Sequence, residues 1–458
     1  MTPTSPPQVL TARLRAHDDS HTFERYADTG GYSALRKAIT SMTPAEVHAE
    51  VKTANLIGRG GFIMPAGIKW GLMRESTPRY VVVNGDEGEP CTFKDHLLVE
   101  RDPHQLVEGV LLTAYAVGAP LAFVYLRGEF ALGLERLQTA IDEAYANGMA
   151  GAGLFGTDVS IDVVAHPGAG AYICGDETAL LESLEGKKGF PRIKPPTPAH
   201  AWREANYPAV FGLYGAPTVV NNLETLSNIP WVVEHGGAAY AAIGAEGSSG
   251  TRLVCMAGNV RRPGTYEIEL HKTTYRDLIF DEKLGGGLPE GRELRFFIPG
   301  GSSSPWFGSQ HLDVPYSKVG VETAKGVLPD GGGTMLGSGS VVVVDDSVCP
   351  VRVAWRLTKF YAHESCGQCT PCREGGSWLE KALRRIEAGA GRAEDVKTIV
   401  DVCRGLVPKF QWPLPYTTIC QLGPSIPMPI VSAIQMFPEE FERHVSEGGC
   451  PYVGSVPA

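Results

Sequence analysis

The stretch His363-Glu-Ser-Cys-Gly-Gln-Cys-Thr-Pro-Cys-Arg-Glu-Gly375 is the feature around which the chain is organised. Its cysteines, Cys366, Cys369 and Cys372, follow one another at intervals that cannot be spread along one helical face. A glycine and a proline within the run are turn residues, which allow the backbone to bring the sulfur atoms to a common centre. A cubane iron–sulfur cluster takes four thiolates and accepts a distant fourth, whereas a structural zinc site usually pairs two such runs or adds histidines. The spacing therefore predicts an iron–sulfur cluster, with zinc as the alternative.

The fourth ligand of this cluster is left open by the spacing. Cys403, Cys420 and Cys450 all lie downstream. Cys420 stands in a loop rich in proline and glycine that can bend toward the cluster, and Cys450 is near the chain end. Cys403 falls inside a helical pattern, where a cysteine is more often a small buried hydrophobic residue.

The composition describes an ordinary globular protein of 458 residues, 43% of them hydrophobic and 20% charged. A length of this kind favours two to four domains. The net charge of −10 argues against a surface that binds nucleic acid. The start of the chain lacks the apolar core of a secretory signal, so a reducing cytoplasm is expected, where clustered thiols indicate a metal. The longest apolar stretch, 110–125, is broken by Gly118 and Pro120, and we expect no direct membrane insertion.

An α/β domain is predicted from the alternation of short β-branched runs with helical patterns. Strands are expected at 79–84, 121–126 and 160–165, and helices at 104–117 and 134–146. Thr43-Pro44 is expected to begin an earlier helix, with proline at its first position. This alternation predicts a parallel, Rossmann-like sheet whose ligands bind at the carboxyl ends of the strands.

The pattern of predicted strands and helices beyond the α/β domain divides the rest of the chain into further parts. Short strands and glycine pairs after residue 246 predict a small α+β module, and helices are expected near 394–406 and 430–444. The predicted division is a loosely ordered arm at 1–30, the α/β domain at 31–245, the α+β domain at 246–338, a helical bundle carrying the cluster at 339–446, and a tail at 447–458.

Two glycine-rich or acidic loops precede and follow the first strand. The first loop, with Gly58, Gly60 and Gly61 before Lys69, is a candidate phosphate-binding loop. Small residues let backbone N–H groups approach an anion, and the lysine adds positive charge. The alternative is a simple turn. The acidic residues of the second loop suit hydroxyl groups of a ribose or ribityl chain, or a divalent metal, or they form a solvated turn. They are Asp86, Glu87 and Glu89.

Two further pairs have a similar ambiguity. Asp176 and Glu177 follow a glycine-rich strand exit, like the acidic residues of the second loop. Asn221 and Asn222 follow a β-branched run, and their amides are able both to donate to and to accept from a flavin ring edge. Taken alone, the asparagines indicate a turn.

Two of these motifs resemble those of a known family, the flavin-carrying, NADH-oxidising F subunit of NADH-quinone oxidoreductase, which is respiratory complex I. Glu364–Gly375 is close to the cluster motif of that family. Gly168-Ala-Gly-Ala-Tyr-Ile-Cys-Gly-Asp-Glu-Thr-Ala-Leu180 is close to its flavin motif. The resemblance covers roughly residues 25–450. It implies a flavin α/β domain, a ubiquitin-like (SLBB-type) module and a helical 4Fe-4S domain.

Ligand sets follow from this resemblance. It implies that Glu89 and Glu177 orient the nicotinamide, that NADH lies near Gly60, Gly61, Lys69 and Tyr172, and that the cluster ligands are Cys366, Cys369, Cys372 and Cys420. The residues implied to hold FMN, together with Asp176 beside them, are Gly58, Gly60, Asn84, Asp86, Glu87, Tyr172, Gly175, Val220, Asn221, Asn222 and Thr225.

This chain departs from the family pattern mainly around the nucleotide. Ile63 stands where the family has a glycine, and the positions of phenylalanines that stack on adenine hold Met64, Leu72 and Thr197. Stacking of a base on an aromatic ring contributes about 1–3 kcal/mol in nucleic-acid sites, so its loss is expected to weaken NADH binding.

The sequence thus predicts an electron-entry subunit in which NADH gives a hydride to FMN, and electrons continue singly to a 4Fe-4S cluster and toward quinone. The expected partners are other complex I subunits, especially a 2Fe-2S thioredoxin-like subunit and a multi-cluster subunit, at the cytoplasmic side of the cell membrane. One alternative is the related flavin and iron–sulfur subunit of a NAD-linked formate dehydrogenase or hydrogenase. Another is a wiring or scaffold subunit that does not bind NADH.

Overall fold

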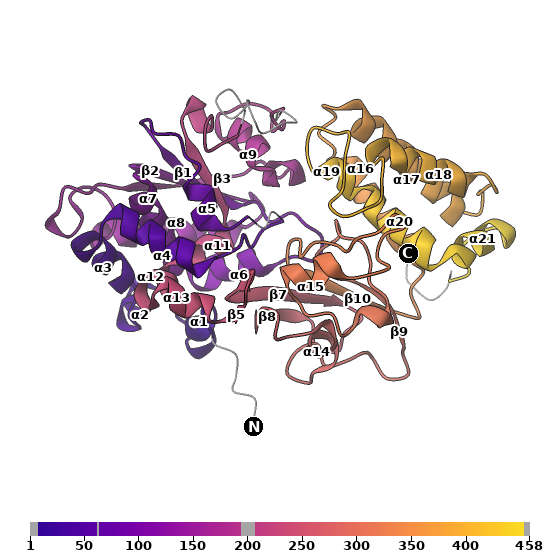
Figure 1. The fold of residues 1–458 in the computed structure, drawn as a ribbon, viewed down its shortest axis with the longest axis horizontal. Helices are drawn as coiled ribbons and strands as arrows, with labels where there is room; N and C mark the ends of the chain where they lie inside the picture. The colour runs from indigo at the N-terminus through magenta and orange to yellow at the C-terminus, as the bar shows by residue number, and fades with distance from the viewer. Residues whose placement is uncertain (1–7, 62–63, 194–206, 453–458) are drawn as a thin grey trace. The chain divides into compact units, whose positions relative to one another are not determined.

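The computed structural model describes residues 8–61, 64–193 and 207–452 (Figure 1). Ile63 and Thr197, two of the departures noted above, lie outside the described residues. The chain forms two compact units. The first contains residues 1–88, 93–254 and 267–272, and the second contains residues 89–92, 255–266 and 273–458.

The first unit is built on a four-stranded sheet in the order β3-β2-β1-β4. The strands are β1 (Tyr80–Gly85), β2 (Leu121–Leu126), β3 (Asp162–Pro167) and β4 (Thr218–Asn222). Every pairing in this sheet is parallel, as the alternation of strands and helices predicts. Val81, Val82 and Val83 of β1 are fully buried, because a parallel strand with neighbours on both sides is covered on both faces.

Helices connect and cover these strands. The long helix α7 (Pro103–Val117) packs against β1 and β2, and α8 (Ala131–Ala146) packs against β3. α4 (Pro44–Ala54) begins as predicted: the Thr43 side chain and Glu46 form a capping box, with Pro44 at the first helical position. The other helices of the unit are α1 (Ala12–Ala16), α2 (Phe23–Asp28), α3 (Ser33–Ser41), α5 (Ala66–Trp70), α6 (Lys94–Arg101), α9 (Glu177–Leu184), α11 (Leu223–Ser227), α12 (Ile229–His235) and α13 (Gly237–Ala241). Short 3-10 turns are η1 (Leu154–Gly156), η2 (Tyr172–Gly175) and η3 (Leu213–Gly215), and a small hairpin is formed by β5 (Gly244–Ala245) and β6 (Ser248–Ser249).

The expectation of a loosely ordered arm is wrong for residues 8–30. Val9, Leu10 and Tyr26 are buried in the core of the first unit. The Glu267 carboxylate accepts hydrogen bonds from the backbone N–H groups of Val9 (2.8 Å), Leu10 (3.0 Å) and Thr11 (2.9 Å). The arm is therefore part of the folded unit, held by a carboxylate far away in the sequence.

A mixed four-stranded sheet lies in the α+β part, in the order β8-β7-β10-β9. Its strands are β7 (Thr251–Gly258), β8 (Gly264–Glu269), β9 (Leu294–Ile298) and β10 (Ser340–Asp345). β10 pairs parallel with β7 and antiparallel with β9. The predicted boundary between residues 338 and 339 is therefore misplaced, because it would remove β10 from the middle of its own sheet. Other elements here are α14 (Tyr275–Phe280), η4 (Ser309–His311) and α15 (Lys318–Thr323).

The C-terminal part of the second unit is a helical bundle, drawn in yellow-orange to yellow in Figure 1. Its helices are α16 (Pro350–Glu364), α17 (Thr370–Glu387), α18 (Asp395–Leu406), α19 (Leu422–Ser425), α20 (Pro427–Met436) and α21 (Pro438–Ser446). The helix predicted at 430–444 is in fact two, since Pro438 cannot continue α20 and instead opens α21. Within the described ranges, no helix combines the length and apolar character needed to cross a bilayer.

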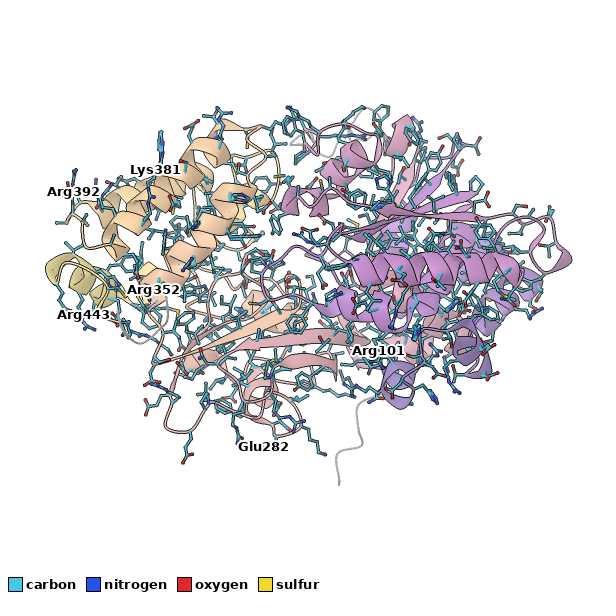
Figure 2. The ribbon with its side chains drawn as sticks, turned by 180° about the vertical axis from the view of Figure 1, so that it is seen from behind. Arg101, Glu282, Arg352, Lys381, Arg392 and Arg443 are labelled. Atoms are coloured by element: carbon cyan, nitrogen blue, oxygen red, sulfur yellow. The ribbon has the colours of Figure 1, made fainter. Side chains whose placement is uncertain are left out.

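Glu267 provides a test of the N-terminal arm. Glu267→Gln keeps the shape but places an NH2 group among N–H donors, so buried donors lose their acceptor. We expect the free energy of unfolding of the first unit to fall by about 3 kcal/mol and proteases to cleave within residues 8–30. Glu282→Gln is the control, since Glu282 (Figure 2) has an exposed side chain paired with Arg261. Equal protease resistance of E267Q and the unaltered protein would contradict this role of Glu267.

Candidate functional site

The edge where the parallel strands end holds the predicted polar residues of the first unit. Asn84 on β1 lies opposite Asn222 on β4, and Val83 lies opposite Asn221. The chain leaves β1 toward β2 and β3 on one side, then returns to place β4 on the other side of β1. Such a reversal of strand order opens a crevice at the carboxyl ends, the usual ligand position in open α/β sheets. The β1/β4 edge is therefore the candidate site of this unit.

Each asparagine at this edge is fixed by specific hydrogen bonds. The Asn221 side-chain oxygen accepts from the indole N–H of Trp70 (2.9 Å). Asn222 donates to Asp95 (2.6 Å), and its oxygen accepts the Glu224 N–H (3.1 Å) at the start of α11. The Asn84 amide donates to the carbonyl of Gly175 (2.7 Å). Asn221 and Asn222 therefore end a strand and begin a helix, rather than forming a simple turn.

The loop of Gly58, Gly60 and Gly61 lies against this edge. A Cβ on Gly60 would stand 3.3 Å from the Asn222 Cβ, so a side chain there would crowd the amides, whereas a Cβ on Gly61 would meet nothing within 4 Å. Gly58 donates its N–H to the Met64 carbonyl (3.1 Å). Glycine at position 60 therefore allows the loop backbone to pass close to Asn222.

Arg59 anchors the same loop from within the core, a role that sequence analysis missed. Its backbone N–H donates to the Thr225 hydroxyl (2.9 Å). Its fully buried guanidinium donates to the Tyr240 hydroxyl (3.0 Å) and the Ser249 carbonyl (2.9 Å). Nothing in the neighbouring sequence indicates that an arginine between two glycines is buried. The buried position of Arg59 is therefore visible only from its contacts with distant residues.

The acidic loop after β1 is not a solvated turn. Glu87 accepts the backbone N–H groups of Lys94 (2.8 Å), Asp95 (2.9 Å) and His96 (2.9 Å), and so caps the N-terminus of α6. Burial, with the Asp95 carboxylate nearby, raises the pKa of Glu87 to about 7. Asp86 is buried, with the Arg127 guanidinium 3.7 Å away.

Lys94 is a second buried charge that sequence analysis missed. Its ammonium lies 2.8 Å from both the Asp95 and Glu224 carboxylates, and 3.5 Å from the Asn222 side-chain oxygen. Burial alone lowers the pKa of Lys94, but the two carboxylates hold it above its ordinary value. The lysine therefore stays charged beneath the amides of the strand-end site.

The segment from Tyr172 to Glu177 leads into α9. Asp176 caps this helix by accepting the N–H groups of Thr178 (2.9 Å) and Ala179 (3.1 Å), a structural role that sequence analysis missed. Glu177, the first residue of α9, pairs with Lys69 at 2.8 Å, with both side chains partly exposed. A Cβ on Gly175 would lie 3.4 Å from the Asp86 carbonyl oxygen, and Val220 is buried in β4.

Glu89 lies in the second unit, whereas Glu177 lies in the first. The Glu89 carboxylate accepts the Ser302 hydroxyl (2.9 Å) and the Ser303 N–H (2.9 Å). Ser302 is also hydrogen-bonded to the Tyr361 hydroxyl at 2.6 Å. Glu89 is thus a positioned carboxylate rather than part of a solvated run.

The cysteine-rich stretch forms the connection between α16 and α17. Gly367 has a φ of +77°, which gives the turn expected of it, while the proline of the run, Pro371, instead opens α17. Cys369 is the N-cap residue of α17 and Cys372 lies in its first turn. Burial, together with the neighbouring Cys369 and Cys366, raises the pKa of the Cys372 thiol to about 11, against the Ser365 hydroxyl, which lowers it. The thiols of this loop are close enough to act on one another electrostatically.

The three candidates for a fourth ligand have different surroundings. Cys420 is half-buried just before α19, which packs against α17. Cys403 is fully buried in α18, as a small hydrophobic residue would be. Cys450 belongs to another group of side chains, with Cys349, Glu387 and His444.

Both sites fit the groups that the sequence predicts. Three thiols in one loop and the helix start beside it, with a further cysteine just before α19, have the donor chemistry of an iron–sulfur cluster. The strand-end site offers amides, a buried lysine and a glycine loop that a Cβ would crowd, which suits a flavin with its phosphate.

Two family models match the chain. One, described as the Nuo51 FMN-binding domain, matches residues 51–231. The other, the NADH-ubiquinone oxidoreductase-F iron-sulfur binding region, matches residues 352–444. The first therefore covers the strand-end site, and the second covers the whole cysteine loop together with Cys420.

Curated relatives match along nearly the whole length, and each is an F subunit of NADH-quinone oxidoreductase. The F 2 subunit of Rhizobium meliloti is 45% identical over 436 residues, which are 95% of this chain and 97% of the relative. The F subunit of Streptomyces coelicolor is 42% identical, covering 98% and 94%. The F subunit of Escherichia coli is 38% identical, covering 96% and 93%.

A solved structure is also similar. A chain of an NAD+-reducing [NiFe]-hydrogenase in the H2-reduced state superimposes with a TM-score of 0.78 at 32% identity. The match covers 92% of this chain but only 66% of the hydrogenase chain.

Lys94→Met tests the buried charge cluster. Asp95 and Glu224 would remain buried without their cation, which costs about 3–5 kcal/mol in the free energy of unfolding. Urea unfolding measures this loss. Lys187→Met is the control, since its ammonium is largely exposed. A Lys94→Met variant as stable as Lys187→Met would contradict the assignment.

Proposed function

The chain belongs to the family of the F subunit of NADH-quinone oxidoreductase, and on this premise we propose that it is the electron-entry subunit of such a complex. The observation that carries the proposal is the presence of both sites in one chain. The first unit has asparagine side chains at the carboxyl ends of parallel strands, and the helical part has four thiols of cluster type. Together they serve a reaction that takes electrons in pairs and passes them on singly.

FMN binding is assigned to the strand-end site. Bound there, FMN would accept a hydride from NADH and release electrons one at a time to a 4Fe-4S cluster. Asn84, Asn221 and Asn222 present amides already oriented by Gly175, Trp70 and Asp95. The other residues assigned to FMN are Gly58, Gly60, Asp86, Glu87, Tyr172, Gly175, Asp176, Val220 and Thr225.

Lys94 has a positioning role in this assignment. Its charge is balanced by two carboxylates on one side and reaches the Asn222 oxygen on the other. The ammonium lies beside the Asn222 side-chain oxygen, and the Asn222 amide nitrogen donates to Asp95. Lys94 and Asp95 together therefore fix the orientation of the Asn222 amide.

NADH is assigned to residues beside the glycine loop. Gly60 and Gly61 would admit the nucleotide close to the backbone, with Lys69 and Tyr172 beside them. Glu177 is held by Lys69 at 2.8 Å, and Glu89 by Ser302 and Ser303. We assign both carboxylates to orienting the nicotinamide, because hydride transfer needs geometry more than an acid or base.

The cluster is assigned to Cys366, Cys369, Cys372 and Cys420. The α17 N-terminus at Cys369 favours negative charge, which the four thiolate ligands of the cluster supply. Zinc is the weaker assignment for this loop, because a structural zinc site usually pairs two C-x2-C runs or adds histidines, and the family model covering the loop is an iron–sulfur region.

The partners and location are part of the same proposal. We assign the chain to a complex containing a 2Fe-2S thioredoxin-like subunit and a multi-cluster subunit. Its place would be peripheral, at the cytoplasmic side of the cell membrane, with quinone reduced elsewhere in the complex. The architecture proposed for it is a flavin domain, a ubiquitin-like module extended to Asp345 so as to keep β10, and a helical cluster domain.

One alternative has an observation in its favour. The similarity to a chain of an NAD+-reducing hydrogenase supports a soluble NAD-linked enzyme that uses the same module. The curated relatives favour complex I, since those of Rhizobium meliloti and Streptomyces coelicolor match over 97% and 94% of their own length, whereas the hydrogenase chain is matched over 66%.

The experiment that tests the function is anaerobic reduction by NADH. We expect the flavin absorption band of the purified protein, with FMN restored, to bleach when NADH is added. The scaffold alternative rests on Ile63, where the family has a glycine, and on Met64, Leu72 and Thr197, where the family has phenylalanines. A protein that binds FMN but stays oxidised at millimolar NADH would establish that alternative.

The assignment of Cys420 has its own test. In Cys420→Ser we expect loss of most of the cluster iron and of the low-temperature EPR signal of the reduced protein, because a cubane then lacks a thiolate ligand. Cys403→Ser is the matched control and should keep both, since Cys403 is buried within α18. An intact cluster signal in C420S would reject Cys420 as the ligand.

A further inference from the structure

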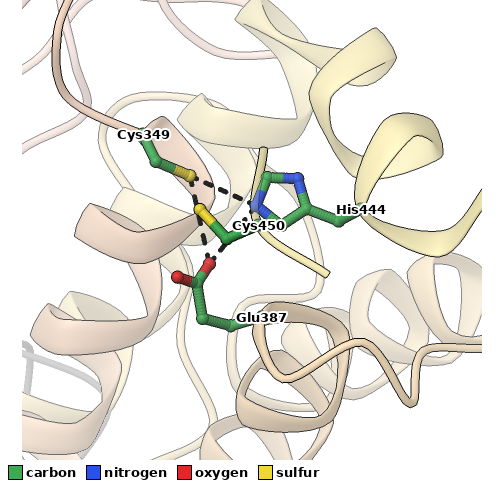
Figure 3. A group of neighbouring side chains, drawn as sticks. All are labelled: Cys349, Glu387, His444 and Cys450. Atoms are coloured by element: carbon green, nitrogen blue, oxygen red, sulfur yellow. Dashed lines mark hydrogen bonds and ion pairs between the residues drawn. The ribbon is translucent and has the colours of Figure 1, made fainter. Parts of the chain in front are cut away.

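Four side chains from distant parts of the second unit meet outside the cysteine loop. They are Cys349, Glu387, His444 and Cys450, and one ligand atom of each lies within 4.8 Å of the others (Figure 3). Cys349 precedes α16, Glu387 ends α17, His444 lies on α21, and Cys450 follows α21. No spacing motif links these positions in the sequence.

The separations match those of donor atoms around one small cation. The Cys349 sulfur is 3.3 Å from His444 Nε2 and 3.9 Å from Glu387 Oε2, and those two atoms are 3.3 Å apart. Bonds of about 2.0–2.3 Å at tetrahedral angles place neighbouring ligand atoms about 3.3–3.8 Å apart. The three distances among Cys349, Glu387 and His444 are therefore close to the edges of a zinc coordination tetrahedron, and the Cys450 sulfur lies within 4.8 Å of each of these atoms.

The surrounding contacts orient the ligands inward. His444 donates its Nδ1–H to the Glu440 carbonyl (2.6 Å), which leaves the lone pair of Nε2 directed at the other three groups. Arg352, labelled in Figure 2, donates from its guanidinium to Glu387 Oε1 (2.6 Å), while Oε2 faces the group. Metal-binding histidines and carboxylates are usually held by such outer contacts.

The Cys349 and Cys450 side chains are buried. The Cys349 sulfur also accepts the Arg352 backbone N–H (3.3 Å) at the start of α16, a contact that suits a thiolate. Because the side chains of Cys349 and His444 are buried, water does not reach the group to take the place of one of its four ligands.

We propose that Cys349, Glu387, His444 and Cys450 bind one zinc ion, separate from the iron–sulfur cluster. Two sulfurs, one imidazole nitrogen and one carboxylate oxygen suit zinc rather than calcium or magnesium, which take oxygen ligands. Two thiolates, a carboxylate, the Arg352 guanidinium and a dication together carry no net charge, so the buried site is neutral. Four protein ligands leave no open position, which is the pattern of a structural site. The ion fastens the segment after α21 to the ends of α16 and α17.

The test is metal analysis of the full chain, isolated anaerobically with its cluster. We expect about one zinc per chain in addition to the cluster iron, and X-ray absorption at the zinc edge showing two sulfur and two nitrogen or oxygen neighbours. Cys450→Ser should lose the zinc and keep the iron. Cys366→Ser is the matched control, since it should lose iron and keep zinc.

These two variants also separate the proposed site from zinc bound adventitiously by cluster thiols. Zinc retained in C450S, zinc lost in C366S, or a coordination shell of four sulfurs would overturn the proposal. So would an unaltered protein without zinc, in which the four groups form only a hydrogen-bonded network or a Cys349–Cys450 disulfide. Because the absorption measurement uses unaltered protein, poor folding of a variant does not leave the question open.

Discussion

Parallel pairing of β1 with both β2 and β4 is the constraint on which the first unit depends. Parallel strands end at one edge, so the register that sets Asn84 opposite Asn222 also brings the acidic loop and the asparagine pair together. An antiparallel β4 would send its asparagines to the opposite edge. The helices α7 and α8 are needed because parallel strands can be joined only by crossovers.

Charge burial is the second constraint: carboxylates balance the charge of Lys94, whereas neutral oxygen acceptors solvate that of Arg59. Lys94 has two carboxylates at 2.8 Å, and Arg59 is held by Tyr240 and Ser249. An unpaired charge at these depths would be expensive to desolvate, whereas a paired one leaves the amides above it in a fixed orientation. The buried ion pairs of Lys94 therefore help to fix the asparagine side chains of the strand-end site.

Local signals are sufficient for several of the regular elements. The run Leu121–Leu126 is predicted with the observed ends, and Thr43-Pro44 opens α4 as its capping chemistry requires. Contacts between distant residues are not visible in this way. The arm is buried because Glu267 accepts N–H groups from residues more than 250 positions away, and β10 reaches the middle of its sheet late in the chain.

The two groups of cysteines in the second unit show the same division. The sequence predicts the group of Cys366, Cys369 and Cys372 because a single loop supplies all three. The start of α17 then positions Cys369 and Cys372. Cys349, Glu387, His444 and Cys450 come from separate helix ends, so only the packing of α16, α17 and α21 assembles them. The cysteine loop supplies three of the proposed cluster ligands by itself, and only Cys420 has to be brought to it by packing. The mixed set exists only after the bundle has closed, so a metal held there stabilises the closed bundle specifically.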